Sequence, residues 1–265
     1  MVTDLSKFMD AVHEKSPLVH HITNYVTVND CANICICSGG SPIMTDEMKD
    51  VVDISRIAGA VVLNMGTLNE RTVESMQMAG SVAKKNGVPV VFDAVGAGAT
   101  SYRNLVADRI IMDVKPEVLK GNAGEISFLA GVAGGVKGVD STSTAENIGD
   151  LVLGLAKKYG CVVVATGKKD YISDGKDLYV LSNGSDYQGT VSGTGCMLSS
   201  VIGAYVGASG ADLFAVIAAI TAFNVAAEHA ELECKGPGSF KVSLLDCLYN
   251  LKSSDMEKEA KIKKV

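Results

Sequence analysis

A regular alternation of buried-strand runs and helical runs constrains the fold of this chain more than any other feature. Residues 60–66 (AVVLNMG) are typical of a short buried strand, residues 69–87 space their apolar side chains as a helix does, and residues 88–96 (VPVVFDAVG) form a second strand run. The order repeats in residues 144–167, where a helical run ends in a lysine pair and a glycine and is followed by CVVVATG. We therefore predict an α/β fold with a mostly parallel central sheet and helices on both faces.

Two further segments complete this predicted fold. Residues 170–184 contain two alternating runs around Asp174 and Gly175, which predict an antiparallel hairpin at one edge of the sheet. Residues 193–251 have the pattern of helices. Because no internal repeat or Pro/Ser-rich linker divides the chain, we expect one domain over residues 1–265.

Composition narrows the class of partner. A net charge of −6 argues against nucleic acid and against a membrane surface, since both require a cationic face. The acidic, helically spaced first 15 residues do not resemble a secretory signal, so we expect a cytoplasmic protein with reduced thiols. The apolar run 213–231 is interrupted by Asn224 and is expected to be a core helix. Cys31, Cys35 and Cys37 lack the spacing of a zinc site and are expected to pack in the core.

Five Gly-rich polar loops follow predicted strands or turns. In an open parallel sheet, ligands bind beyond the carboxyl ends of the strands, so these loops should form one site. They are NMGT (64–67), DAVGAGAT (93–100), KGNAGE (120–125), ATGKKD (165–170) and SGTGC (192–196). Neither GAGATS (96–101) nor the Gly-Lys pair at 167–168 has the spacing of a dinucleotide-binding or Walker motif.

The last of these loops predicts an anion site. Apolar residues after Gly195 recur at three- and four-residue spacing, so a helix should begin at about residues 193–195 with its free N–H groups facing outward. Glycines allow the backbone to approach a ligand closely, and the helix dipole favours negative charge. We therefore predict a phosphate-binding turn made by Gly193, Thr194, Gly195 and Cys196.

Several separated motifs together carry a family resemblance. VHHITNYVTVNDCAN (19–33), SPIM (41–44), NMGT, FDAVGAGAT, KGNAGE, TGKKDYISDG and SGTGCMLSSV occur in this order and span nearly the whole chain. In these motifs the chain resembles the hydroxyethylthiazole kinases of thiamine salvage. The resemblance implies a ribokinase-like three-layer sandwich that phosphorylates the primary hydroxyl of 4-methyl-5-(2-hydroxyethyl)thiazole with ATP and Mg²⁺. It also implies a homotrimer with substrate pockets at subunit contacts.

The resemblance assigns roles to individual residues. Met44 would line the thiazole pocket, and Gly193 would contact the substrate near its reacting hydroxyl. The ATP-binding residues would be Lys120 and Thr166, and the residues that serve magnesium and the phosphates, directly or through water, would be Asp93 and Glu125. Hard carboxylate oxygens suit Mg²⁺.

The chain departs from the family pattern at two positions. Ala94 stands where proline is usual, and Lys120 stands where arginine is common. The first change removes a restraint on φ, and the second replaces a planar bidentate fork by a single ammonium. Both changes could raise the ATP concentration that the enzyme requires, and neither removes a reacting group.

Cys196 occupies the position where wider ribokinase relatives have an aspartate base. An ordinary thiol, with a pKa near 8.5, is only slightly ionised at neutral pH. Phosphoryl transfer tolerates a poor base because its transition state is loose. We therefore expect Cys196 chiefly to orient the alcohol, with weak base character.

Other interpretations stay open at the level of sequence. The chain could be a hydroxymethylpyrimidine or pyridoxal type of kinase, a nucleotide-dependent dehydratase of the same fold, or a non-catalytic nucleotide sensor. The role of Asp93 could be no more than to cap a turn, Glu125 could be a solvated acid in the first turn of a helix, and Met44 could be a core residue. His20, His21 and His229 are expected to pack or to bond to loops, because they lack metal spacing.

Overall fold

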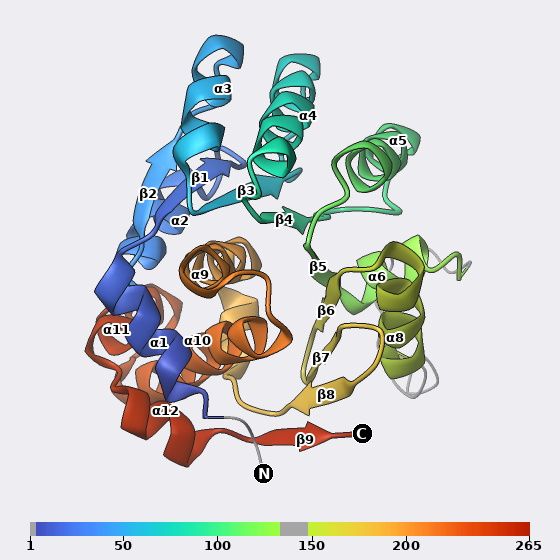
Figure 1. The fold of residues 1–265 in the computed structure, drawn as a ribbon. Coiled ribbons are helices and arrows are strands. Elements are labelled where there is room, and N and C mark those ends of the chain that lie inside the picture. The colour runs from blue at the N-terminus through green and yellow to red at the C-terminus, as the bar shows by residue number, and fades with distance from the viewer. Residues whose placement is uncertain (1–3, 133–147) are drawn as a thin grey trace.

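A nine-stranded sheet organises the protein (Figure 1). The structure is a computed structural model, and it describes residues 4–132 and 148–265. The strand order is β2-β1-β3-β4-β5-β6-β7-β8-β9, with parallel pairing from β2 to β6 and antiparallel pairing from β6 to β9. The strands are β1 (Leu18–Ile22), β2 (Ser41–Met44), β3 (Ala60–Asn64), β4 (Val90–Asp93), β5 (Val118–Asn122), β6 (Val162–Thr166), β7 (Asp170–Ser173), β8 (Leu178–Leu181) and β9 (Ile262–Lys264).

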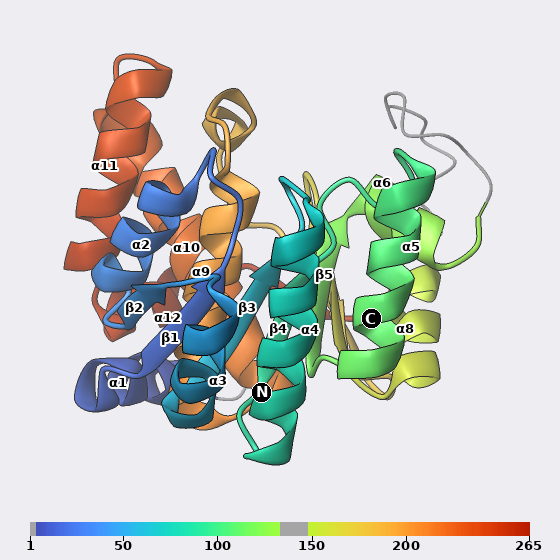
Figure 2. The same ribbon diagram turned by 90° about the horizontal axis from the view of Figure 1, so that it is seen from above.

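Helices cover both faces of this sheet. One layer comprises α1 (Ser6–Lys15), α2 (Val28–Cys37), α9 (Thr194–Ser209), α10 (Leu213–Glu233), α11 (Pro237–Asn250) and α12 (Ser253–Glu259). The other comprises α3 (Met48–Ile57), α4 (Glu70–Lys85), α5 (Ser101–Arg109) with the π-turn Ile110–Val114, α6 (Ala123–Leu129) and α8 (Ile148–Tyr159). Figure 2 shows α9 beside the sheet, with α10 and α11 farther out.

Each helical layer encloses its own apolar core, because successive strand residues point to opposite faces. In β3, Val62 joins the core under α9, whereas Val61 and Leu63 join the core under α4. Both faces of the central strands are buried, which explains why these strands read as continuous apolar runs in the sequence. The predicted parallel sheet with helices on both faces is confirmed.

The predicted elements appear close to their expected bounds. The first β-α-β unit is β3-α4-β4, and the hairpin around Asp174 and Gly175 is β7-β8 at the antiparallel side of the sheet. The start of the helical run 144–159 lies outside the described residues, and the remainder is α8. The short strand β9, which pairs with β8, was not predicted.

Helix α10 is the most apolar element of the fold. By length and composition it could cross a membrane, but 83% of its apolar window is buried inside the protein. It packs between α9 and α11, so the predicted core helix is confirmed. Cys31 and Cys35 are also buried in the core as predicted, and Cys37 is half-buried.

Candidate active site

Four consecutive parallel strands end in polar residues at one edge of the sheet. These ends carry Asn64 on β3, Asp93 on β4, Asn122 on β5 and Thr166 on β6. The register aligns Asn64 with Asp93 and Asp93 with Lys120, so the three side chains occupy neighbouring positions. The Gly-rich loops that were predicted to form one site therefore meet at this edge, and the N-terminus of α9 lies against them.

Asp93 is the most enclosed polar residue of this edge. Its side chain is fully buried, and three side chains donate to it. Lys120 Nζ lies 3.1 Å from Oδ1, while Asn64 Nδ2 and Ser199 Oγ each lie 2.8 Å from Oδ2. A buried acid is costly unless it is paired and hydrogen-bonded, so these three donors offset the cost of burying Asp93 and hold its side chain in one orientation.

Lys120 connects Asp93 to the first turn of α9. Its Nζ also donates to the backbone carbonyl of Gly195 at 2.8 Å. A Cβ at position 195 would lie 3.2 Å from Nζ, so glycine leaves room for this contact. Burial alone would lower the pKa of Lys120, but the nearby acidic groups, Asp93 first among them, raise it. A permanent cation therefore lies beside the predicted phosphate-binding turn.

Cys196 lies next to this ion pair. Its Sγ accepts hydrogen bonds from Asn24 Nδ2 and Asn64 Nδ2, both at 3.3 Å. Burial and the Asp93 carboxylate raise the pKa of the Cys196 thiol. The thiol is thus neutral near pH 7, and its two amide donors fix the position of the sulfur.

Gly193 is required by geometry at the start of α9. Its φ is 88°, in the left-handed region that favours glycine. A Cβ there would approach Thr27 Cγ2 to 2.1 Å, so a larger residue would push the N-terminus of α2 away from that of α9. The predicted helix start is confirmed, and Gly193 allows the α2 and α9 ends to lie in contact.

Glu125 joins two of the loops. Its carboxylate accepts from Gly96 N at 2.7 Å and from Asn122 N at 2.6 Å. Asn122 Oδ1 in turn accepts from Glu125 N, and the two bonds form a capping box at the start of α6. Burial raises the pKa of Glu125, and the Asp93 carboxylate adds to this effect. Glu125 therefore holds the loop after β4 against the loop after β5.

Arg103 on α5 fixes the same loops from outside. Its guanidinium donates to the carbonyls of Met65, Val95 and Gly66 at 2.6, 2.8 and 2.8 Å. One planar fork thus joins the loop after β3 to the loop after β4. Sequence reasoning did not identify Arg103, because its partners are backbone atoms 8 to 38 residues away.

A cavity of about 530 Å³ opens beside the N-terminal part of α9, and Cys196 is not among its lining residues. Its wall includes Thr166, one of the two residues predicted to bind ATP, together with Thr194 and Gly195 of the predicted phosphate-binding turn. The other predicted ATP residue, Lys120, does not line the cavity and reaches it only through its bond to Gly195. The Thr166 hydroxyl donates to the Gly121 carbonyl at 3.4 Å. The remaining lining comes from Asn122, Gly167, Lys168, Asp170, Ser182, Asn183, Gly184, Ser185, Asp186, Gln188, Gly189, Leu198, Phe223 and Asn224. The cavity has the size and polarity expected of a site for a polar small molecule.

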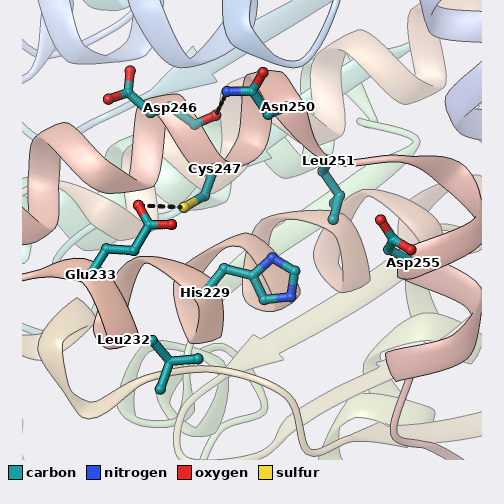
Figure 3. Close-up of a pocket in the computed structure, with 8 residues that line it drawn as sticks. All are labelled: His229, Leu232, Glu233, Asp246, Cys247, Asn250, Leu251 and Asp255. Carbon is teal, nitrogen blue, oxygen red and sulfur yellow. Dashed lines mark hydrogen bonds between the residues drawn. The ribbon is translucent and has the colours of Figure 1, made fainter.

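A second cavity, of about 270 Å³, lies between α10, α11 and α12 (Figure 3). Its side chains include His229, Cys247 and three acids, and it shares no lining residue with the cavity at the strand ends. Cys247 Sγ is 3.8 Å from Glu233, and His229 Nε2 is 2.8 Å from Glu259. Within residues 4–132 and 148–265, no group of three or more His, Cys, Asp or Glu residues could hold a metal ion. We assign no activity to this second cavity.

Met44 stands apart from the other predicted site residues. It is half-buried at the end of the edge strand β2, and β1 separates β2 from β3. His20 bonds to Ser55 and Thr45, and His21 to the Val19 carbonyl, as expected for packed histidines. The role of Met44 stays a prediction.

Asn24, Asn64 and Ser199 were missed by sequence reasoning. Asn24 and Asn64 lie within the quoted motifs VHHITNYVTVNDCAN and NMGT, and Ser199 follows Cys196 by three residues, which is one helical turn. The position of Ser199 could have been found from helical spacing. The contact of the two asparagines with Cys196 could not, because it spans 172 and 132 residues.

Comparisons with known proteins identify the family of the chain. A sequence profile of the "Hydroxyethylthiazole kinase family" matches residues 9–254. The chain belongs to this family. It is 48% identical over 257 residues to "Hydroxyethylthiazole kinase" of Methanocorpusculum labreanum, with 97% of each chain covered. The solved hydroxyethylthiazole kinase of Pyrococcus horikoshii superposes with a TM-score of 0.91 at 38% identity, with 98% of each chain covered.

The ribokinase-like fold is confirmed as well. A ribokinase-like superfamily protein of Enterococcus faecalis superposes with a TM-score of 0.66 over 94% of each chain, although only 12% of residues are identical. At such low identity the likeness concerns the fold alone.

Proposed function

We propose that this protein phosphorylates the primary hydroxyl of hydroxyethylthiazole with ATP, as the name of its family states. One observation carries the proposal: Lys120 joins the buried Asp93 carboxylate to Gly195, which lines the cavity at the strand ends and directly precedes Cys196. A cation, a helix N-terminus and a glycine turn together suit a phosphoryl group that carries growing negative charge.

In this scheme the nucleotide occupies the large cavity, with Thr166 on its wall and its phosphates directed to the α9 turn. The alcohol lies beside Cys196, whose sulfur is held by Asn24 and Asn64. Because the thiol is neutral, it orients the hydroxyl and contributes little as a base. Alignment of the two reactants supplies most of the rate, as expected for a loose transition state.

Magnesium fits the acids of this site. Asp93 at the end of β4 and Glu125 in the first turn of α6, which follows the adjacent strand β5, offer hard oxygen ligands at the same edge of the sheet. Both carboxylates already accept protein donors, which suits an ion that keeps most of its waters and phosphate ligands. When bound, Mg²⁺ would neutralise charge on the phosphates.

The whole chain would act as one cytoplasmic kinase domain and assemble as a homotrimer. The family profile spans residues 9–254, which supports a single domain. Met44, half-buried on the edge strand β2, would lie beside another subunit and line the thiazole pocket. We expect solution sizing to give about three times the 27.6 kDa chain mass. A fully active monomer would contradict this assembly.

A coupled assay for ADP tests the activity. The purified protein is supplied with Mg²⁺ and ATP and with a panel of alcohols: hydroxyethylthiazole, hydroxymethylpyrimidine and pyridoxal. We expect ADP release that depends on hydroxyethylthiazole. Preference for another alcohol, or ATP consumption without an alcohol, would contradict the proposal.

A further inference from the structure

Asp170 is a buried acid that lines the large cavity, and none of the roles assigned above uses it. It begins β7 and is only 5% exposed. Its Oδ1 accepts from Gly167 N at 3.1 Å, and its Oδ2 accepts from Asn224 Nδ2 at 2.7 Å. Both oxygens are thus engaged, one by the loop after β6 and one by helix α10.

The hydrogen bonds continue beyond Asn224. Its Oδ1 accepts from Gln188 Nε2 at 3.2 Å, and Gln188 Oε1 accepts from Ser185 N at 2.9 Å. The Gln188 carbonyl in turn accepts from Thr194 Oγ1 at 2.8 Å, at the phosphate-binding turn. One connected chain therefore runs from the loop after β6 to the start of α9.

The members of this chain surround the cavity. Gly167, Asp170, Ser185, Gln188, Thr194 and Asn224 all line it, and they come from four separate segments. Among the described residues, no strand pairing joins these four segments to one another. Asp170 and Asn224 are its buried members, and buried polar groups rigidify a structure where they are hydrogen-bonded to one another. The chain thus fixes the relative positions of the loop after β6, the turn 185–190 and the N-terminus of α9.

We propose that Asp170 and Asn224 are positioning residues that hold the nucleotide cavity in its binding shape before ATP arrives. This inference rests on the proposed function in one respect, namely that ATP occupies this cavity. A cavity that is already ordered loses less conformational entropy on binding, so the pair lowers the dissociation constant for ATP. It does not touch the reacting hydroxyl, and turnover at saturation should depend on it weakly.

The direction of the hydrogen bonds makes this proposal testable. A carboxylate only accepts, whereas an amide has one acceptor and one donor side. In Asp170→Asn, three side-chain amides would stand between the N–H groups of Gly167 and Ser185, so at one link of the chain a donor meets a donor whichever way the amides turn. In the exchanged double variant Asp170→Asn/Asn224→Asp, the amide introduced on β7 would accept from Gly167 and donate to the carboxylate introduced on α10, which would also accept from Gln188. Every bond is then restored.

The experiment measures ATP binding and steady-state kinetics in three variants. Calorimetric titration with Mg²⁺ and ATP needs no alcohol, and the ADP assay gives KM for each substrate and kcat. For Asp170→Asn we expect the dissociation constant and KM for ATP to rise about tenfold, the scale of one mispaired buried donor, with kcat and the thiazole KM within about threefold. The exchanged double variant should recover most of the ATP affinity. Gln188→Ala should weaken ATP binding less, and its effect should not add to that of Asp170→Asn.

Charge provides an internal check. Loss of a carboxylate from a cavity that receives an anion would, by charge alone, tighten ATP binding. Asp212→Asn is the matched control, because Asp212 caps the N-terminus of the helix α10 that carries Asn224, is exposed, and is replaced by an equally good cap.

Three outcomes would overturn the proposal. These are tighter or unchanged ATP binding in Asp170→Asn, ATP binding by the exchanged double variant that is as weak as that of the single variant, or an equal rise in KM for ATP and for the thiazole. If Asp170→Asn does not fold, Gln188→Ala decides by the same KM comparison. An inactive wild type would contradict the proposed function, whereas an active wild type with an unaffected Asp170→Asn would contradict this inference alone.

Discussion

The ammonium of Lys120 lies 3.1 Å from the carboxylate of Asp93, and both side chains are almost completely buried. A buried pair is not by itself a strong source of stability, because both ions lose their hydration. Its value here is electrostatic, since the second contact of Lys120 is the carbonyl of Gly195 at the start of α9. The pair therefore holds a fixed charge where the phosphates are expected.

Breaking the pair from either side should destabilise the fold. Lys120→Met leaves Asp93 without its cation, and Asp93→Asn leaves Lys120 without its anion, so we expect each to lower the free energy of unfolding by about 3–5 kcal/mol. The double variant removes both charges and should regain much of this loss while staying inactive. Urea unfolding of the four proteins measures the coupling. Strictly additive losses would mean that the pair is not a unit.

The two carboxylates of the site should be needed for turnover. Asp93→Ala and Glu125→Ala are expected to reduce kcat by about 10²-fold or more at saturating ATP and Mg²⁺, because both groups stabilise charge in the transition state or position the groups that do. Glu74→Ala, at an exposed position of α4, is the control. Near-normal turnover in both site variants, with folding verified by circular dichroism, would remove them from the mechanism.

The sequence predicted the fold well because buried parallel strands and amphipathic helices have strong local patterns. It also located Gly193 and the start of α9, since glycine spacing and helical periodicity are local signals. The strand β9 was missed, because three residues with two lysines carry no strand pattern and only the pairing with β8 defines them. The type of most helices and strands is thus predictable from local sequence pattern, whereas a strand such as β9 depends on pairing with a distant segment.

The site was predictable as a set of loops and less so as a set of contacts. Asp93 and Lys120 were chosen singly, each for a ligand, and the structure reveals that they bind each other. The asparagines that hold Cys196 come from loops far away in the chain, and an asparagine after a strand is equally typical of a turn. Contacts of this kind depend on which loops meet, and no local spacing encodes that.

His21 should give the protein a defined acid sensitivity. It is buried, and its Nε2 is without a hydrogen-bond partner among the described residues. Burial lowers its pKa from 6.5 to about 4. Below pH 6.5 the unfolded chain therefore binds a proton at His21 that the folded chain does not bind. The contribution of neutral His21 to the free energy of unfolding is complete above pH 6.5 and is lost as the pH falls to about 4. A pKa difference of this size corresponds to about 3 kcal/mol.

Replacing the ring tests this pH dependence. His21→Phe keeps a ring of similar size and cannot titrate, so its unfolding free energy should fall less steeply between pH 6.5 and 4 than that of the wild type. The same exchange at the exposed His13 should leave the wild-type slope. Chemical unfolding at several pH values gives the comparison. Parallel curves for wild type and His21→Phe would show that His21 binds its proton equally in both states.

Cys196 provides the sharpest test of the proposed chemistry. General base catalysis commonly raises a rate by about 10²- to 10⁴-fold. Because the thiol mainly orients the hydroxyl, Cys196→Ala should lower kcat by only part of that factor and leave ATP binding nearly unchanged. In Cys196→Asp, the amides of Asn24 and Asn64, which now donate to the sulfur, are placed to donate to a carboxylate, and Lys120 lies close enough to offset its charge. An aspartate is ionised at pH 7 and is a better base than a neutral thiol. We therefore expect Cys196→Asp to keep or raise the hydroxyethylthiazole-dependent rate in the ADP assay. If this rate collapses in a folded Cys196→Asp protein, the sulfur itself shapes the pocket or takes part in covalent chemistry, and the orienting role assigned to it is wrong.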